Sequence, residues 1–193
     1  MAKTSRPARP HTLRIIGGTW RGRRIPVPDL AELRPTPDRV RETVFNWLAP
    51  AIGGARCLDL FAGTGALGLE ALSRGARSAL FVERSAPAAR NLREQIERLG
   101  AEARAEVRCA DAFEFLRDDH TPFDLVFLDP PFRSDLLERC LTPLAVPGRL
   151  APAALVYLES ASSAGAPALP AGWELLRSKI AGEVGYHLAR IPA

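Results

Sequence analysis

The chain has 193 residues, of which 47% are hydrophobic, and a formal net charge of +4. This length allows one domain with a good core and some additions. No apolar run approaches the roughly 20 residues that span a bilayer. The basic N-terminus lacks the apolar core of a signal peptide, so we expect a cytoplasmic protein.

The cysteines and histidines do not indicate a metal site. Cys57, Cys109 and Cys140 are far apart, and the three histidines are scattered. Neither set has metal-ligand spacing, so we expect no metal. Two of the cysteines fall in expected strands and one in an expected helix, which predicts reduced, buried thiols.

Positive charge is concentrated at the start of the chain. Residues 1–28 contain seven Lys or Arg and no Asp or Glu, so taking +7 from the total of +4 leaves −3 for the remainder. Arg supplies nearly all cations of this chain, which weakens an argument from their number. Their separation from acids still indicates an anionic partner. The alternative is a solvated edge that discourages aggregation.

The first 50 residues divide into a tail and an extension. Residues 1–12 have no periodicity, and we expect a disordered basic tail. Residues 13–50 form an N-terminal extension, which begins with a hairpin over 13–25 that turns at Gly17-Gly18. Its helix has Thr36 as N-cap and Pro37 at the first position. The apolar face of that helix consists of Val40, Val44, Trp47 and Leu48, and we expect Trp47 to pack in the core.

From residue 51 to residue 193, expected strands and helices alternate. The strands are expected at 56–60, 78–83, 106–110, 123–128, 154–159, 173–180 and 184–191. The helices are expected at 66–74, 87–99, 112–117 and 136–144. This order predicts an α/β fold, a doubly wound and mostly parallel sheet with helices on both faces and an antiparallel end.

A glycine turn follows the first of these strands. Gly63, Gly65 and Gly68 form a Gly-x-Gly-x-x-Gly pattern between strand and helix, which is typical of a nucleotide-cofactor loop. Dinucleotide-binding proteins share the pattern, so alone it is weak. Asp59 lies just before the turn, where a pyrophosphate would be repelled and a positively charged cofactor would be attracted.

Acidic residues follow four successive strands. They are Asp59, Glu83, Asp111 and Asp129. The carboxyl ends of parallel strands meet at one edge of the sheet, where ligands bind. Each acid alone could cap a helix, and for Asp111 a cap and a binding role are about equally supported. Four together indicate a binding site, with Glu83 placed to hold ribose hydroxyls.

The run Asp129-Pro130-Pro131-Phe132 is the most specific signal. Two prolines end the strand in a rigid turn, because proline cannot donate to a sheet ladder. The Asp129 carboxylate and the Pro130 carbonyl then form two fixed acceptors, which suit an exocyclic amino group. Phe132 offers an aromatic face to a flipped base. The alternative is a strand-ending turn with Phe132 in the core.

The stretches 59–65 and 129–132 together resemble the S-adenosylmethionine-dependent amino-methyltransferases of the Rossmann-like class. The stretches 14–18, 20–23 and 34–43 resemble the bacterial family that methylates a guanine N2 of 16S ribosomal RNA. The resemblance covers residues 13–191. It implies a seven-stranded sheet with the last strand antiparallel, S-adenosylmethionine as cofactor with S-adenosylhomocysteine as product, and a substrate within the small ribosomal subunit or its assembly intermediate.

By position, the resemblance also implies roles for single residues. Asp59, Gly63 and Gly65 would hold the methionine end, Glu83 the ribose, and Asp111 with Ala112 the adenine. Further cofactor contacts are expected from Phe61, Arg84, Thr36 and Arg39. Asp129, Pro130, Pro131 and Phe132 would receive the target base as the catalytic residues. For the basic segment we expect RNA contacts from Arg14, Trp20, Arg21, Arg23 and Arg24.

Two other functions fit part of the pattern. A DNA adenine-N6 or other amino-methyltransferase could use a similar motif after the fourth strand, although these enzymes usually carry a further domain. An NAD-dependent oxidoreductase, or a non-catalytic dinucleotide-binding module, would account for the glycine loop. Neither of the latter would account for Asp129-Pro130-Pro131-Phe132 or for the basic segment.

Overall fold

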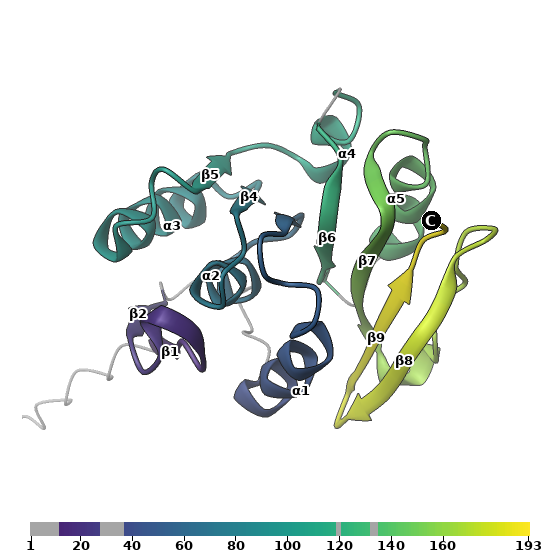
Figure 1. The fold of residues 1–193 in the computed structure, drawn as a ribbon, viewed down its shortest axis with the longest axis horizontal. Helices are drawn as coiled ribbons and strands as arrows, with labels where there is room; N and C mark the ends of the chain where they lie inside the picture. The colour runs from purple at the N-terminus through teal and green to yellow at the C-terminus, as the bar shows by residue number, and fades with distance from the viewer. Residues whose placement is uncertain (1–11, 28–36, 119–120, 132–134) are drawn as a thin grey trace, which may run out of the picture.

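Seven strands form the main sheet of the structure, a computed structural model that describes residues 12–27, 37–118, 121–131 and 135–193 (Figure 1). Across the sheet the order is β5-β4-β3-β6-β7-β9-β8. The strands are β3 (Arg56–Asp59), β4 (Ser78–Val82), β5 (Ala105–Arg108), β6 (Phe123–Leu128), β7 (Leu150–Ala161), β8 (Glu174–Ala181) and β9 (Val184–Arg190).

Strand direction confirms the predicted mostly parallel sheet. The pairs β5–β4, β4–β3, β3–β6 and β6–β7 are parallel. Strand β9 pairs antiparallel with both of its neighbours, β7 and β8, so it alone runs against the others, as its arrowhead in Figure 1 shows. The last strand of the chain is thus the antiparallel one, inserted beside β7.

Helices cover both faces of the sheet, which confirms the doubly wound arrangement. They are α1 (Asp38–Leu48), α2 (Ala66–Ser73), α3 (Ala86–Leu99), α4 (Ala112–Phe115) and α5 (Leu136–Leu144). Successive strand residues point to opposite faces. Cys57 and Phe127 therefore join the core beneath α1, α2 and α3, whereas Leu58 and Val126 join the core beneath α4 and α5.

The N-terminal extension packs onto the first of these cores. Strands β1 (Thr12–Arg14) and β2 (Arg24–Pro26) pair antiparallel, which confirms the hairpin in outline. Between them the chain forms a short 3-10 helix, η1 (Gly18–Trp20), where the sequence predicted strand. Gly18 has a φ of 74°, and a Cβ there would lie 1.8 Å from the Ser73 carbonyl oxygen. Close contact with α2 therefore sets the path of η1.

Other expectations are confirmed or corrected at single elements. Helix α1 begins at Asp38 with Pro37 as the preceding residue, while the expected cap Thr36 and residues 1–11 of the expected tail lie outside the described residues. Trp47 packs against the core, as predicted, and stacks on Tyr186 with ring centroids 5.4 Å apart. Cys109 is exposed, so its predicted burial is wrong, because edge strand β5 ends one residue earlier.

Candidate functional site

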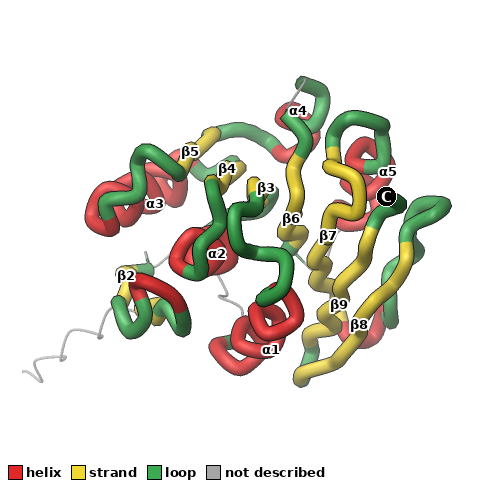
Figure 2. The backbone as a smooth tube through the Cα atoms, viewed as in Figure 1, coloured by secondary structure: helices red, strands yellow, loops and turns green. Residues whose placement is uncertain are grey.

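The acids predicted at the strand ends come together at one edge of the sheet. Figure 2 shows that the strands β4, β3 and β6, which carry three of them, lie side by side. Asp59 is paired in register with Phe81 on β4 and with Phe127 on β6. Glu83 and Asp129 each follow these partners by two residues, so they lie at the same edge, on either side of Asp59. The parallel topology thus confirms that these positions are neighbours in space.

The glycine loop connects this edge to α2. Gly65 is the residue before the helix and has a φ of 77°, a left-handed conformation that glycine adopts without strain. A Cβ on Gly68 would lie 2.2 Å from the Phe81 ring, so glycine lets α2 pack directly on β4. The Ala62 N–H donates to the Val82 carbonyl at 2.9 Å and holds the loop against the neighbouring strand.

Glu83 joins the glycine loop to the start of α3. Its Oε2 accepts from the Gly63 N–H at 2.8 Å, and its Oε1 accepts from the Ser85 N–H at 2.7 Å. Ser85 in turn caps α3 by accepting from the Ala88 N–H. The half-buried carboxylate is therefore fixed in place by two backbone donors, and each oxygen retains a further lone pair.

Asp59 is buried behind the loop, with only 2% of its surface exposed. Its Oδ2 accepts from the Gly68 N–H at 2.9 Å and so connects β3 to α2. Burial raises the pKa of Asp59 to about 7 against the opposing effect of that hydrogen bond, and the Glu83 and Glu159 carboxylates add to the increase. A cation bound nearby would favour the ionised form.

Asp111 caps α4 at the same edge. Its Oδ1 accepts from the Phe113 N–H at 2.8 Å and from the Glu114 N–H at 3.4 Å. Of the two roles predicted for Asp111, a helix cap and a binding residue, the helix cap is thus confirmed. The side chain is exposed while the next residue, Ala112, is buried, so the cap presents its carboxylate outward above an apolar surface.

The proline turn follows β6, which ends at Leu128 as predicted. Asp129 is half-buried, Pro130 is buried and Pro131 is exposed. Phe132 and Thr36 lie outside the described residues, so their expected roles stay predictions. Among the further expected cofactor residues, Phe61 is half-buried, and Arg39 and Arg84 are exposed.

Glu159 is an acid of this edge that the sequence reasoning missed. It follows Leu158, the register partner of Leu128, so it lies beside Asp129 across the sheet. It is 2% exposed, and the Tyr157 hydroxyl donates to its Oε1 at 2.7 Å. Burial, with the adjacent Glu159 carboxylate, raises the pKa of Tyr157 well above its ordinary value. The predicted fifth strand ended at Glu159, so the strand-end rule could have found it.

Trp20 requires a correction among the residues expected to contact RNA. Its ring is buried in the first core, with 7% exposed, and Arg104 lies over it at 5.7 Å from the centroid. It has no free face for a nucleotide, because the contact of η1 with α2 turns it inward. Arg14, Arg21, Arg23 and Arg24 are all exposed.

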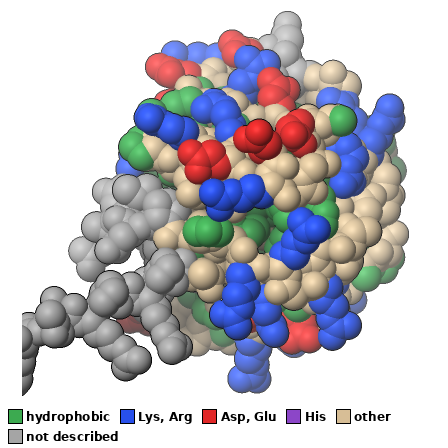
Figure 3. Space-filling model, turned by 90° about the vertical axis from the view of Figure 1, so that its left-hand side faces the viewer, with side chains coloured by type: hydrophobic (Ala, Val, Ile, Leu, Met, Phe, Trp, Pro, Cys, Tyr) green, Lys and Arg blue, Asp and Glu red, His purple; other side chains and the backbone are tan. Residues whose placement is uncertain are grey.

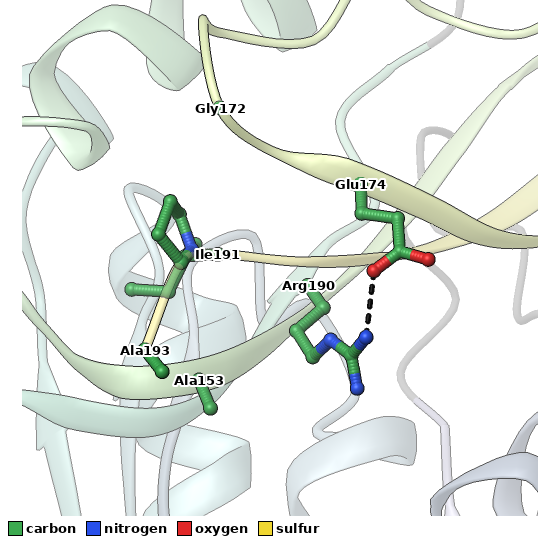
Figure 4. Close-up of a pocket in the computed structure, with 7 residues that line it drawn as sticks. Ala153, Gly172, Glu174, Arg190, Ile191 and Ala193 are labelled. Atoms are coloured by element: carbon green, nitrogen blue, oxygen red, sulfur yellow. Dashed lines mark hydrogen bonds and ion pairs between the residues drawn. The ribbon is translucent and has the colours of Figure 1, made fainter.

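Figure 4 shows the residues around a cavity of about 270 Å³. Its lining lies at the start of β7, including Ala153, and at the end of β9, away from the strand ends that carry the acids. Arg190 is its one cation, and this residue forms an ion pair with Glu174 at 2.6 Å. This cavity therefore belongs to a separate part of the fold.

Two general features concern metals and membranes. Within the described ranges, no three His, Cys, Asp or Glu side chains are grouped to hold a metal ion. None of the described helices has the length and apolar character needed to cross a membrane.

Comparison with known proteins agrees with this geometry. The solved structure of the Escherichia coli protein yhhF superposes with a TM-score of 0.88 at 49% identity and covers 95% of this chain and 99% of that one. The structure of SMU.776 complexed with SAH superposes with a TM-score of 0.62 at 15% identity and covers 78% of this chain and 49% of that one. This similarity concerns the fold alone. The sheet and its helices thus form the Rossmann-like methyltransferase fold.

Sequence comparison identifies the family. Ribosomal RNA small subunit methyltransferase D of Escherichia coli is 52% identical over 176 residues, which are 91% of this chain and 88% of that one. The protein of the same name from Haemophilus influenzae is 42% identical over 97% and 98% of the two chains. The family model described as conserved hypothetical protein 95 matches residues 13–190. The chain therefore belongs to this family and is a relative of the ribosomal RNA small subunit methyltransferases D.

Proposed function

We propose that this protein transfers a methyl group from S-adenosylmethionine to the exocyclic N2 of a guanine in 16S ribosomal RNA. The observation that carries the proposal is the Asp129-Pro130-Pro131 turn at the end of β6, next to Asp59 and the glycine loop at the end of β3. The names of the relatives support small-subunit RNA as the substrate. The resemblance of the proline turn to amino-methyltransferases supports an amino group as the acceptor.

The residues of the strand ends fit this cofactor chemically. Glu83 is fixed by two backbone donors and can still accept from two ribose hydroxyls. Asp111 and Ala112 offer an acceptor above an apolar surface, which suits an adenine ring with its amino group. The Asp59 carboxylate would compensate the positive charge of the cofactor. When bound there, the cofactor supplies a methyl group activated by a sulfonium. We assign further cofactor contacts to Gly63, Gly65, Phe61 and Arg84, and we expect Arg39 and Thr36, the latter outside the described residues, to help close the site.

The protein's contribution to the transfer is mainly positional. The Asp129 carboxylate and the Pro130 carbonyl accept the two N–H groups of the guanine amine and orient its lone pair. The cofactor would supply the methyl group to that lone pair with its sulfur as the leaving group, and the proton lost by the amine would pass to Asp129 or to water. Such alignment can contribute several kcal/mol to lowering the barrier.

The basic surface of the N-terminal extension supports a nucleic-acid substrate. Arg14 and Arg24 are opposite each other in the β1–β2 ladder, and both are exposed. Like charges facing one another are unfavourable until an anion lies between them. We therefore assign RNA phosphate contacts to these two residues and to Arg21 and Arg23. The partner is the small ribosomal subunit or its assembly intermediate, in the cytoplasm.

The decisive experiment is radiolabelled methyl transfer to small subunits that lack the modification, followed by mapping of the labelled nucleotide. We expect label on the N2 of one guanine of 16S RNA. Asp129→Ala should abolish transfer and leave S-adenosylhomocysteine affinity close to wild type. Label on an adenine, or stabilisation by NAD in a thermal-shift assay without stabilisation by S-adenosylhomocysteine, would instead support one of the two alternative functions.

A further inference from the structure

A second groove of about 250 Å³ lies between β2 and the C-terminal part of α3. Three arginines line it, namely Arg23, Arg24 and Arg98, together with the apolar side chains of Ile25 and Leu99. Among the described residues, no acid lines the groove and none of the three arginines forms an ion pair. This composition differs from that of the cavity at β9, where the single arginine is neutralised by Glu174.

Gln95 gives the groove an unusual polar group. It occupies a core-facing position of α3, one turn after Leu92, and it is 3% exposed. Its buried amide Nε2 has no hydrogen-bond partner in the part of the chain that the structure describes. A buried donor left without a partner is unfavourable, so an apolar side chain at this position would stabilise the core better. A ligand acceptor reaching the groove would satisfy this donor.

At the C-terminal end of α3, backbone carbonyls that would repel an anion already accept hydrogen bonds. The last carbonyls of a helix normally repel negative charge. Here the Glu97 and Ile96 carbonyls accept from the Gly100 N–H, and Ile96 accepts also from the Ala101 N–H. Arg23 Nη1 donates to the Arg98 carbonyl at 3.4 Å. The groove therefore presents guanidinium groups, with those carbonyls already engaged.

We propose that this groove binds a phosphate–ribose unit of the RNA substrate, with the arginines and Gln95 contacting the phosphate and the half-buried Leu99 contacting the sugar. Figure 3 faces the end of the molecule that carries α3 and the N-terminal strands, and it shows Lys and Arg side chains around apolar surface. The inference rests on the proposed RNA substrate and adds an anchoring site to it.

The groove is distinct from the site of methyl transfer. Ser85, which Glu83 connects to the glycine loop, caps the first end of α3, and the groove lies at the other end. The 14 residues of this helix span about 20 Å. A nucleotide held in the groove is therefore a remote part of the substrate and not the target base. It should affect binding of the RNA and leave the chemical step unchanged.

The test compares three variants of the full chain. Arg98→Gln removes one groove cation, and Gln95→Leu removes the amide without changing charge. Arg90→Gln is the matched control, an exposed arginine of the same helix that does not line the groove. Binding of a short fluorescein-labelled RNA is measured by anisotropy over a range of salt, together with KM and kcat for unmodified small subunits.

We expect Arg98→Gln and Gln95→Leu each to weaken RNA binding and raise KM roughly tenfold, as for loss of a charge-assisted hydrogen bond. Arg98→Gln should also make the log–log salt slope shallower by about 0.7. Arg90→Gln should bind RNA as wild type does. In all three variants, kcat and the affinity for S-adenosylhomocysteine should be unchanged. Gln95→Leu should be at least as stable as wild type, because it removes an unpartnered donor. If it fails to fold, Arg98→Gln against Arg90→Gln still decides the question.

Equal RNA binding by wild type and folded Gln95→Leu would overturn the groove as a site, even if the charge variants bind less well. So would equal effects of Arg98→Gln and Arg90→Gln. Failure of the proposed function has a different signature, since RNA binding would then depend on the groove while no guanine of the small subunit becomes labelled.

Discussion

At the scale of single residues, Glu83 shows how one carboxylate can organise a binding edge. It holds Gly63 and Ser85 through their backbone N–H groups and faces the expected position of the ribose. We predict that Glu83→Ala weakens S-adenosylmethionine binding by about 1.5–3 kcal/mol, the usual value of a hydrogen bond to a charged group, or roughly 10- to 150-fold in Kd. Calorimetry measures this, with exposed Glu97→Ala of α3 as control. Unchanged affinity would leave Glu83 with a structural role only.

Asp59 makes stability depend on pH. Its pKa in the folded protein is about 7, above the ordinary 3.8, so the folded state favours the protonated form. The free energy of unfolding should therefore fall as the pH rises from about 4 to about 7, by up to roughly 4 kcal/mol for a three-unit shift. In Asp59→Asn this decrease should be missing. Urea unfolding of both proteins at several pH values checks it, and parallel pH profiles would contradict it.

Not every residue of the site could be found from sequence. The acids at the strand ends could be placed together, because parallel strands have their carboxyl ends at one edge. Trp20 could not be placed correctly. Its burial depends on η1 meeting Ser73, a residue more than 50 positions away, and on a hydrogen bond from its own N–H to the Ser73 hydroxyl. A local pattern contains no information about such a contact.

At the scale of elements, a buried ion network fastens the N-terminal extension to α2. Glu70 of α2 accepts from the Ile16 and Gly17 N–H groups, each at 2.8 Å, and from Arg74 Nε at 2.7 Å. Arg41 of α1 lies 3.6 Å from it, and the side chains of both residues are fully buried. Three segments that are distant in sequence thus share one carboxylate.

Removing the Glu70 carboxylate should destabilise the folded protein. Breaking a buried pair leaves an uncompensated charge, so we predict that Glu70→Ala lowers the free energy of unfolding by about 3–5 kcal/mol. The exposed pair of Glu174 and Arg190 is the control, since Glu174→Ala should cost about 0–1 kcal/mol. Urea unfolding gives both values. A similar small cost for the two variants would show that the network is not important for stability.

The elements themselves were predicted best where burial is continuous. Strand β6 and helix α5 have the expected bounds, because a central apolar run and an amphipathic segment each define their own ends. Strand β7 begins at Leu150, earlier than expected. Its first part includes Pro152 and exposed alanine, and it is held by pairing with Phe123 of β6. That pairing is a property of the sheet and has no local sequence signal.

At the scale of the whole molecule, acids and cations occupy different regions. The acids of the site lie at or just after the carboxyl ends of β3, β4, β5, β6 and β7, whereas exposed arginines gather on the N-terminal strands and beside α3. The acidic edge of the sheet would repel an RNA strand by itself. The adjacent basic surface offsets this repulsion and can hold the RNA backbone while one base enters the site.

Salt dependence tests this division of charge. Arg14 and Arg24 are cross-strand neighbours, and the ion pair of Arg14 with Asp38, at 3.7 Å, is exposed. We predict that changing both to Gln makes the log–log slope of RNA binding against salt shallower by about 1.4–1.8, at 0.7–0.9 per phosphate. The KM for small subunits should rise, while S-adenosylmethionine affinity and kcat stay the same. The matched control changes Arg77 and Arg177, two exposed cations outside the N-terminal strands. An equal slope change in the two double variants would mean that net charge alone drives binding, and no change in either would make the β1–β2 surface a structural edge.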